Sequence, residues 1–485
     1  MYRPALEVAK AVNKSYHIIP VSTEMFADEI TPVMLLKKLK KVSGNCFILE
    51  SAEDSKRWGR YTFLGFDPKM EISCLNGVTV VNGEVRHENP NAVIKQILDM
   101  HKSVKFDYLP PFTGGLMGYF AYDYAKYSVP ELNLDAPDDE GFSDVDLMLF
   151  DKIIAFDNFM QKIIIIVNVS TENLEEEYEK AVKKLDYIRE IITSGEPEIT
   201  APAQLRSEFK PLFGKDEFCG LVDKAKDYIN AGEISQVVLS NRLEAEFEGS
   251  ILDAYRVLRT VNPSPYMFYF SGSTVEIAGA SPETLVKLQD GRLLTFPIAG
   301  TRPRGADNHE DIALEEDLLA DEKELSEHNM LVDLGQEDLG KISRPGSVKI
   351  EKYMRVLRFS HVMHICSEIS GDIKDGLTGL DAVNSMLPAG TLSGAPKIRS
   401  MQIINELEQS KRGIYGGGVG YLDFTGNMDT CIAIRIAYKK NNKVFIRSGA
   451  GVVKQSVPEN EYNECVNKAM VIKSALEAAS GGISN

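Results

Sequence analysis

The sequence predicts an α+β fold. Runs of strand-like and helix-like sequence follow one another without the regular strand–helix–strand rhythm of a parallel sheet, and the strand-rich parts carry tight-turn signals typical of antiparallel hairpins. With 485 residues, 44% of them hydrophobic, the chain is long enough for two domains or one large composite body with a substantial core.

The first strand-rich region extends from residue 47 to about residue 170. Asn76-Gly77 and Asn82-Gly83 are hairpin signals, and Asp157-Asn158 separates the apolar runs KIIAF and QKIIIIVNV. We therefore expect antiparallel sheet here. Residues 171–194 keep apolar side chains at helical spacing and end before a glycine, which predicts a helix.

Residues 195–215 contain three prolines and no clear period, so they are the best candidate for a linker between a region 1–200 and a region 201–485. Beyond it the patterns predict helices and strands in irregular alternation. The expected elements are helices at 216–231, 251–261, 309–334 and 459–479, a strand at 236–247, and late strands broken by turns at 425–427 and 440–442.

Charge and cysteine content exclude several classes of protein. The net charge of −17 argues against a nucleic-acid or anionic-membrane surface as partner. Six cysteines without a CxxC pair favour a reducing compartment, with the cytoplasm as the default. The start of the chain lacks the apolar core of a signal peptide, and the longest aliphatic run, 163–167, is too short to span a bilayer.

A group of late motifs carries the functional signal. Residues 387–399 read LPAGTLSGAPKIR, with Pro396 in the expected first turn of a helix whose free N–H groups could bind an anion. The other motifs are FSHVMHIC (359–366), GIYGGGVGY (413–421), CIAIRIAY (431–438) and IRSGAGVV (446–453). None contains a strand-GxGxxG-helix unit, which excludes a dinucleotide site.

In this order the motifs resemble those of the chorismate-utilising enzymes, and most closely the branch of large subunits that form anthranilate. The resemblance extends from about residue 214 to residue 479, and more thinly upstream through GGLMGYFAYD at 114–123. It implies a large two-layer, mostly antiparallel β-sandwich with helices packed outside, in which the regions 1–200 and 201–485 interleave.

Two pairs of glutamates are candidate metal ligands. Glu324 and Glu327, and Glu461 and Glu464, are each three residues apart, so each pair shares a helix face. In a chain with 71 acidic residues most such pairs are solvated surface. The resemblance implies that Glu327, Glu464 and Glu461 hold Mg²⁺, an ion that needs only one or two protein carboxylates, and that Glu324 assists a hydroxyl group to leave.

The substrate expected from the resemblance is a dianion. By residue type alone, Arg435 among aliphatic neighbours would be a structural, snorkelling or paired arginine, and the glycines would be turns. The resemblance instead implies that Arg435 binds a carboxylate bidentately. Its other expected substrate-binding residues are Gly300, Thr301, Tyr415, Gly449, Gly451 and Lys468.

His364 is the candidate proton carrier. A histidine among Val, Met and Ile is usually a satisfied core residue, and a zinc site with His361 lacks further ligands nearby. The resemblance of the motif VMH implies that His364 assists proton transfer when pyruvate is eliminated, which its ordinary pKa near 6.5 suits. Thr391 is expected to line the same pocket.

Two positions indicate the branch of the family. Branches that activate water carry a lysine where this chain has Gln236, and the common aminodeoxychorismate synthases carry a nucleophilic lysine where it has Ala299. Direct attack by ammonia, giving anthranilate, is the remaining reaction. No G-x-C-x-G motif is present, so a separate glutamine amidotransferase subunit in a hetero-oligomer must supply the ammonia. The alternatives are an aminodeoxychorismate synthase component and a catalytically silent amino-acid sensor.

A second, regulatory pocket for tryptophan is implied upstream. ILES at 48–51 resembles an element of the feedback-regulated enzymes, and NPSPYMF at 262–268 resembles the segment that packs against it. Both could equally be a strand end and a turn. The residues expected to bind the inhibitor are Glu50, which would face its ammonium group, with Ser51, Asn262, Pro263, Pro265, Tyr266, Met267 and Phe268.

Overall fold

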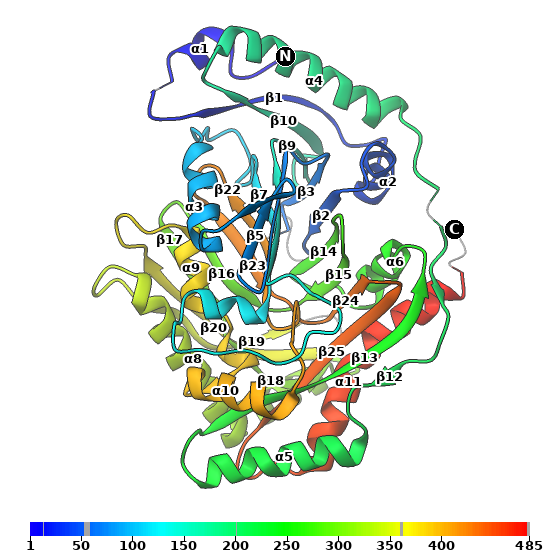
Figure 1. Cartoon of the computed structure of the whole chain (residues 1–485), viewed down its shortest axis with the longest axis vertical. Helices are drawn as coiled ribbons and strands as arrows, with labels where there is room; N and C mark the ends of the chain where they lie inside the picture. The colour runs from blue at the N-terminus through cyan, green and yellow to red at the C-terminus, as the bar shows by residue number, and fades with distance from the viewer. Residues whose placement is uncertain (13, 53–58, 200, 359–361, 483–485) are drawn as a thin grey trace.

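The computed structural model describes residues 1–482 apart from 13, 53–58, 200 and 359–361. Within this part of the chain the strands form two large sheets, and every pairing between named strands is antiparallel. The predicted α+β class is confirmed, with helices on the outer faces of the sheets (Figure 1).

The first sheet has 13 strands in the described residues. In spatial order they are β1 (Ile18–Phe26), β10 (Lys162–Ser170), β9 (Lys152–Asp157), β3 (Tyr61–Phe66), β2 (Cys46–Glu50), β14 (Tyr266–Ser271), β15 (Glu276–Ser281), β24 (Ile436–Lys440), β25 (Lys443–Val452), β13 (Gln236–Glu248) and β11 (Gln204–Leu205), with β12 (Lys210–Pro211) and β21 (Gly394–Ala395) also paired to β13.

The second sheet has 12 strands in the same part of the chain. Their order is β18 (Ile298–Pro303), β20 (Val362–Asp372), β17 (Arg292–Thr295), β16 (Thr284–Gln289), β23 (Met428–Ile432), β22 (Gly418–Asp423), β7 (Gly115–Phe120), β8 (Val145–Phe150), β4 (Met70–Leu75), β5 (Val78–Val81) and β6 (Glu84–Arg86), with β19 (Lys349–Arg358) also paired to β20. Both sheets take strands from either side of residue 200, while the division into regions 1–200 and 201–485 stays a prediction.

The helices lie outside the two sheets (Figure 1). They are α1 (Leu6–Lys10), α2 (Pro32–Val42), α3 (Pro90–Met100), α4 (Leu174–Ser194), α5 (Lys215–Asn230), α6 (Leu252–Val261), α7 (Asn308–Ala320), α8 (Glu322–Ile342), α9 (Gly379–Met386), α10 (Lys397–Glu408) and α11 (Pro458–Ser480), with short 3₁₀ turns η1 (Tyr122–Tyr127) and η2 (Gly390–Leu392).

An aromatic core joins the facing sides of the two sheets. Phe47 of β2 meets Phe150 of β8 edge to face, with ring centroids 4.8 Å apart, and Phe112 stacks on Tyr421 of β22 at 4.1 Å. Separate apolar clusters bury α2, α4, α6 and α11 on the first sheet and α3, α8 and α9 on the second. Burial of apolar surface on both faces of each sheet therefore holds the sandwich together.

The local predictions made from the sequence have different outcomes in the structure. Asn76-Gly77 and Asn82-Gly83 have positive φ at both positions and form the two hairpin turns between β4, β5 and β6. The expected helix at 309–334 is wrong as a single element, because the Asp321 side chain accepts from the backbone N–H groups of Lys323 and Glu324 and caps a new helix, α8. The expected linker also contains the short strands β11 and β12.

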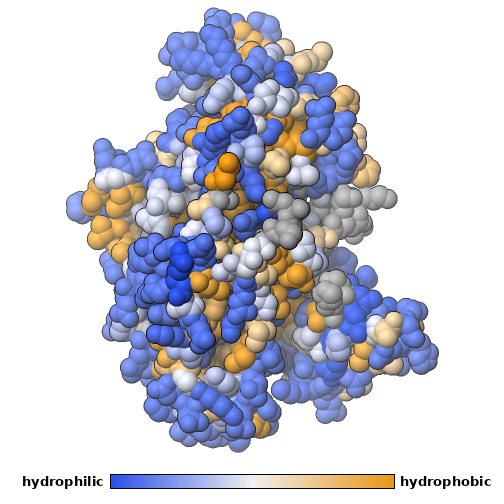
Figure 2. Space-filling model, turned by 90° about the vertical axis from the view of Figure 1, so that its right-hand side faces the viewer, coloured by the Kyte–Doolittle hydropathy of each residue, from blue (hydrophilic) through white to orange (hydrophobic). Residues whose placement is uncertain are grey.

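Hydrophilic residues cover most of the face shown in Figure 2, as the net charge of −17 leads one to expect. All six cysteines are free thiols, and five of them are buried. In the described residues no helix combines the length and the apolar character needed to cross a membrane.

Candidate active site

A cavity of about 780 Å³ collects side chains from distant parts of the chain. It is lined by parts of β13, β18, α8, β20, β25 and α11. Every residue predicted from the sequence for catalysis, substrate binding or metal binding lines it: Gly300, Thr301, Glu324, Glu327, His364, Thr391, Tyr415, Arg435, Gly449, Gly451, Glu461, Glu464 and Lys468. Their individual roles stay predictions.

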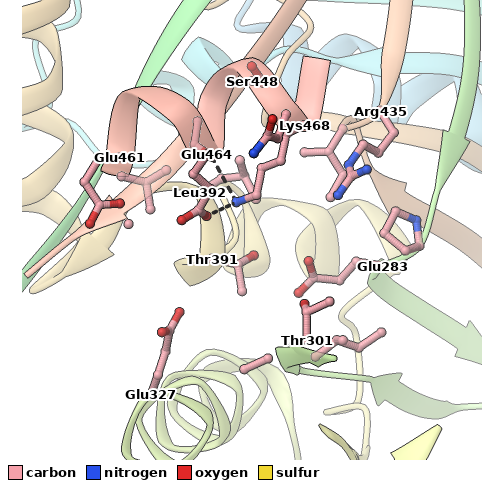
Figure 3. A pocket seen from close by; sticks show the side chains of 18 of the residues that line it. Glu283, Thr301, Glu327, Thr391, Leu392, Arg435, Ser448, Glu461, Glu464 and Lys468 are labelled. Atoms are coloured by element: carbon pink, nitrogen blue, oxygen red, sulfur yellow. Dashed lines mark hydrogen bonds and ion pairs between the residues drawn. The ribbon is translucent and has the colours of Figure 1, made fainter. Parts of the chain in front are cut away.

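Two helices supply the acidic side of the cavity. Glu327 projects from α8, and Glu461 and Glu464 project from α11 on the opposite side (Figure 3). Burial raises the pKa of Glu327 above its ordinary value, and the carboxylates of Glu324 and Glu464 raise it further. Burial likewise raises the pKa of Glu324 and Glu461, with Glu464 again acting in the same direction. These carboxylates therefore repel one another across the cavity.

This donor set suits a hydrated divalent cation. Among the described residues, no group of three or more His, Cys, Asp or Glu side chains lies close enough together to enclose a metal ion. Mg²⁺ needs no such cage, since it binds one or two carboxylates and keeps water or substrate oxygens as its other ligands. A cation between α8 and α11 would relieve the mutual repulsion of the glutamates, so the residues present fit the ion.

The cationic side of the cavity centres on Arg435. The late strand expected between the turns at 425–427 and 440–442 is interrupted, because Arg435 adopts a left-handed backbone conformation with φ of 54°, uncommon for a residue other than glycine. The chain thereby leaves β23 in the second sheet and enters β24 in the first. Burial lowers the pKa of the guanidinium, and within the described residues the side chain makes no ion pair or hydrogen bond. It is therefore available to an anion.

Gly449 and Lys468 form the wall next to Arg435. A Cβ atom at Gly449 would lie 2.7 Å from the Leu239 carbonyl oxygen and 2.8 Å from the Tyr415 hydroxyl, so only glycine allows this approach. Lys468 Nζ donates to the Gly449 carbonyl oxygen at 3.0 Å and pairs with Glu464 Oε1 at 2.6 Å (Figure 3). Lys468 thus connects the wall beside Arg435 to the acidic side of the cavity.

His364 lies in β20, with its orientation fixed by the neighbouring strand. Its Nδ1 donates to the Gly300 carbonyl oxygen at 2.8 Å and lies 3.1 Å from Thr301 Oγ1. A carbonyl oxygen can only accept, so the neutral ring carries its proton on Nδ1 and its lone pair on Nε2. Burial lowers the pKa of the imidazole, with Arg435 acting in the same direction. The expected His361 lies outside the described residues.

Sequence reasoning missed Glu283. This carboxyl group lies near Thr301 and Arg435 in the cavity (Figure 3). Burial raises its pKa to about 8, although Thr391 and Lys468 act in the opposite direction. An acidic residue between two apolar strands, in AGASPETLVKL, is the signal that could have found it. Lys323, Asn460, Asn463 and Asn467 were also missed and line the cavity.

One expected anion site is not part of this cavity. Pro396 is the residue preceding α10 rather than its first helical residue, and neither it nor Lys397 lines the cavity. Lys397 instead forms a hydrogen-bonded ion pair with Asp338. The start of α10 is therefore engaged in packing against α8.

The predicted regulatory segments are neighbouring strands. Met267 and Phe268 of β14 lie opposite Glu50 and Leu49 of β2. The Glu50 carboxylate is buried and accepts from Tyr255 at 2.5 Å and from Arg259 at 2.8 Å.

The same segments divide between two faces of the first sheet. Since side chains alternate along a strand, Met267 belongs to the core beneath the outer helices, whereas Phe268 belongs to the core between the sheets. Tyr266 bonds to Thr284 at 2.9 Å and to Asp429 at 2.8 Å. Asn262, Pro263 and Pro265 lie between α6 and β14, and Ser51 directly follows β2. None of these residues lines the 780 Å³ cavity, and their role in binding an inhibitor stays a prediction.

The two branch-indicating positions are both at the cavity. Gln236 of β13 and Ala299 of β18 line it. A Cβ atom at Gly451 would lie 2.8 Å from the Gln236 amide nitrogen, so the glutamine side chain rests against that glycine. At these two positions the cavity therefore presents an amide and a methyl group. Other branches of the family are expected to carry a lysine at one or the other position.

The fold and the cavity define a chorismate-type enzyme, and comparison with known proteins agrees. The family model described as chorismate binding enzyme matches residues 44–474, and the chain belongs to this family. The resemblance inferred from the motifs is confirmed.

Two curated relatives and one solved structure carry the same name. The chain is 43% identical to anthranilate synthase component 1 from Acetivibrio thermocellus, over 99% of both chains, and 42% identical to that from Aquifex aeolicus, over 98% of both. A crystal structure of anthranilate synthase component I from Streptococcus pneumoniae matches with a TM-score of 0.75 and 37% identity, covering 93% of this chain and 99% of that one. The menaquinone-specific isochorismate synthase from Escherichia coli, at 19% identity and a TM-score of 0.71, shares the fold.

Proposed function

We propose that this chain converts chorismate and ammonia into anthranilate, pyruvate and water, as component 1 of an anthranilate synthase. The observation that carries the proposal is the cavity itself, where the guanidinium of Arg435 has no partner among the described residues and faces a group of glutamates. The names of the relatives support this reaction. The absence of lysine at Gln236 and Ala299 favours ammonia as the nucleophile over water or an enzyme amine.

Substrate binding would use the side of the cavity that contains Arg435 and the neighbouring wall. Arg435 and the backbone N–H groups of Gly449 and Gly451 would bind one carboxylate of chorismate. Each charge-assisted hydrogen bond of this kind stabilises the complex by about 1.5–3 kcal/mol. Tyr415 and Thr301 would border the ring, and the second carboxylate would point toward α8 and α11. Mg²⁺ held by Glu327 and Glu464, with Glu461 beside them, would supply positive charge that neutralises that carboxylate.

Two proton transfers follow from the protonation states. Ammonia forms a bond to the ring carbon next to the carboxylate-bearing carbon, and the ring hydroxyl leaves as water after receiving a proton. Glu283 is the better donor, because a pKa of about 8 keeps it protonated at neutral pH; Glu324, expected from the sequence, lies among the metal-site carboxylates. The proton then lost from the ring would pass to Nε2 of His364 and from there to the methylene carbon of the enolpyruvyl group, whose bond to the ring breaks as pyruvate departs.

The remaining parts of the proposal concern partners and regulation. A glutamine amidotransferase subunit would supply ammonia within a hetero-oligomer in the cytoplasm. Tryptophan would inhibit the enzyme by binding near Glu50 and the segment 262–268. The pairing of β2 with β14 supports a shared role for these two segments.

The test is product identification. The purified chain, given chorismate, ammonium and Mg²⁺, should release equal amounts of anthranilate and pyruvate, and chelation of Mg²⁺ should stop the reaction. Arg435→Ala should lower kcat/KM by roughly ten- to hundredfold, as the loss of a charged hydrogen bond predicts. A 4-amino product, or turnover indifferent to chelators, would contradict the proposal.

A further inference from the structure

A buried network of charged side chains lies directly behind the cavity wall formed by Gly449 and Lys468. Glu408 at the end of α10 is paired with Arg412 and Arg447, with closest distances of 2.6 and 2.7 Å. All three residues are at most 3% exposed. Burying three charged groups costs free energy unless each is fully hydrogen-bonded. The hydrogen-bond partners of these groups therefore show what the network holds in place.

The network is saturated with hydrogen bonds. Both Glu408 oxygens accept from Arg412, Oε1 also accepts from the backbone N–H and hydroxyl of Ser240, and Oε2 accepts from Arg447. Arg447 further donates to Ser240 Oγ at 2.8 Å and to the Lys411 carbonyl oxygen at 2.9 Å. Although burial acts to raise it, the two guanidinium groups hold the pKa of the Glu408 carboxyl below its ordinary value.

The remaining Arg412 donors reach the segments that shape the cavity. Nη1 donates to the Leu392 carbonyl oxygen and Nη2 to the Val238 carbonyl oxygen, each at 2.6 Å. Leu392 follows Thr391, and both Leu392 and Val238 line the cavity. The guanidinium carbon lies 4.6 Å from the ring centroid of Tyr122 and 5.9 Å from that of Tyr415. One side chain thus touches β13, η2 and the loop that carries Tyr415.

Arg447 completes the connection through β25. It lines the cavity and lies two residues before Gly449 in the same strand. The four segments that carry Val238, Thr391, Tyr415 and Gly449 are therefore held by one cluster with a net charge of +1.

We propose that Arg412 and Arg447, both paired with Glu408, are positioning residues. They fix the relative positions of the segments that form the cavity wall beside Arg435. The rigid, forked guanidinium of Arg412 bridges one carboxylate and two carbonyl oxygens, which a lysine ammonium cannot do with the same geometry. The inference rests on the proposed function for its substrate, but its structural part does not depend on the reaction.

Arg412→Lys is the decisive variant, because it keeps the charge and removes the fork. We expect KM for chorismate to rise roughly ten- to hundredfold, with kcat changed by less than about threefold. Hydrogen exchange should accelerate at residues 390–393 and 413–417 while the outer helices stay protected. Glu408→Gln raises the net charge of the cluster to +2. If positioning dominates, KM rises in this variant too, whereas a fall in KM would overturn the proposal.

The matched control is Lys40→Arg. It alters a partly buried ion pair, Lys40–Glu276 at 3.2 Å, which does not line the cavity. This variant should shift the melting temperature without raising KM. An unchanged KM and unchanged exchange at both segments in Arg412→Lys, or a KM rise equal to that of the control, would overturn the inference. Lack of turnover by the unaltered chain would instead contradict the proposed function, and the exchange measurement would still decide the positioning role.

Discussion

Glu283 and Arg435 occupy two adjacent links by which the chain passes from one sheet to the other. The first link joins β15 to β16 and the second joins β23 to β24. The Ile432 N–H donates to the Glu283 carbonyl oxygen at 2.9 Å, and the Ala280 N–H donates to the Arg435 carbonyl oxygen at 3.1 Å. A carboxyl group whose pKa is raised to about 8 and a guanidinium are thereby held at the cavity by neighbouring backbone hydrogen bonds.

The pH dependence of activity tests Glu283. Its pKa of about 8 means that the protonated form is available at neutral pH and is lost as the pH rises. We expect kcat/KM to fall above about pH 8, and Glu283→Gln to lower kcat by roughly 10²- to 10⁴-fold. A full rate profile between pH 6 and about pH 10 provides the measurement.

The stability of the folded chain gives an independent check on the same group. Because the folded state binds this proton more tightly than the unfolded state, the free energy of unfolding should decrease as the pH rises from about 4.5 through about 8. Denaturant titrations should show that Glu283→Gln weakens this decrease. If the variant keeps the whole pH dependence, Glu283 is not the buried acid.

His364 should act through Nε2 as a neutral imidazole. Burial lowers its pKa, so we expect kcat/KM to fall only below the ordinary histidine range, that is, as the pH drops below about 6.5. His364→Ala should reduce kcat by roughly 10²- to 10⁴-fold with little change in KM. A variant of His364 that retains full kcat would rule out the role.

The acidic helices should govern the need for Mg²⁺. Glu464→Gln removes one carboxylate and also the ion-pair partner of Lys468. Glu327→Gln removes a carboxylate that makes no ion pair within the described residues. We expect both to raise the Mg²⁺ concentration required for half-maximal rate by roughly 10- to 100-fold. Titration of the rate with Mg²⁺ measures this, and an exposed glutamate of α4, Glu179→Gln, serves as control.

Glu50 tests the regulatory pocket. Its carboxylate is paired with Arg259, so a ligand ammonium group would have to share or replace that contact. Glu50→Gln should abolish inhibition by tryptophan while leaving kcat within about twofold, and calorimetry should show at least roughly tenfold weaker binding. Val78→Thr, at the exposed first residue of β5, is a control outside both sites. Undiminished inhibition in the Glu50 variant would place the inhibitor elsewhere.

The limits of sequence reasoning are visible in particular residues. Turn chemistry predicted the hairpins at Asn76-Gly77 and Asn82-Gly83, since positive φ is a local property of those residues. It could not predict that 431–438 breaks at Arg435, because an apolar run reads as one strand whichever sheet its ends join. Nor could residue spacing reveal that Arg259 donates a hydrogen bond to the Glu50 carboxylate, since 209 residues separate the two in the chain.

The sequence by itself determined the α+β class, several periodic helices and the kinds of group available for chemistry, because propensity, hydrophobic period and residue type are local. Only the tertiary structure decided that thirteen of those groups line one cavity. It also decided that burial raises the pKa of Glu283 to about 8, and that Glu408, Arg412 and Arg447 form a buried cluster next to that cavity. Solvent exclusion and long-range pairing set those properties, and neither exists until the two sheets close on each other.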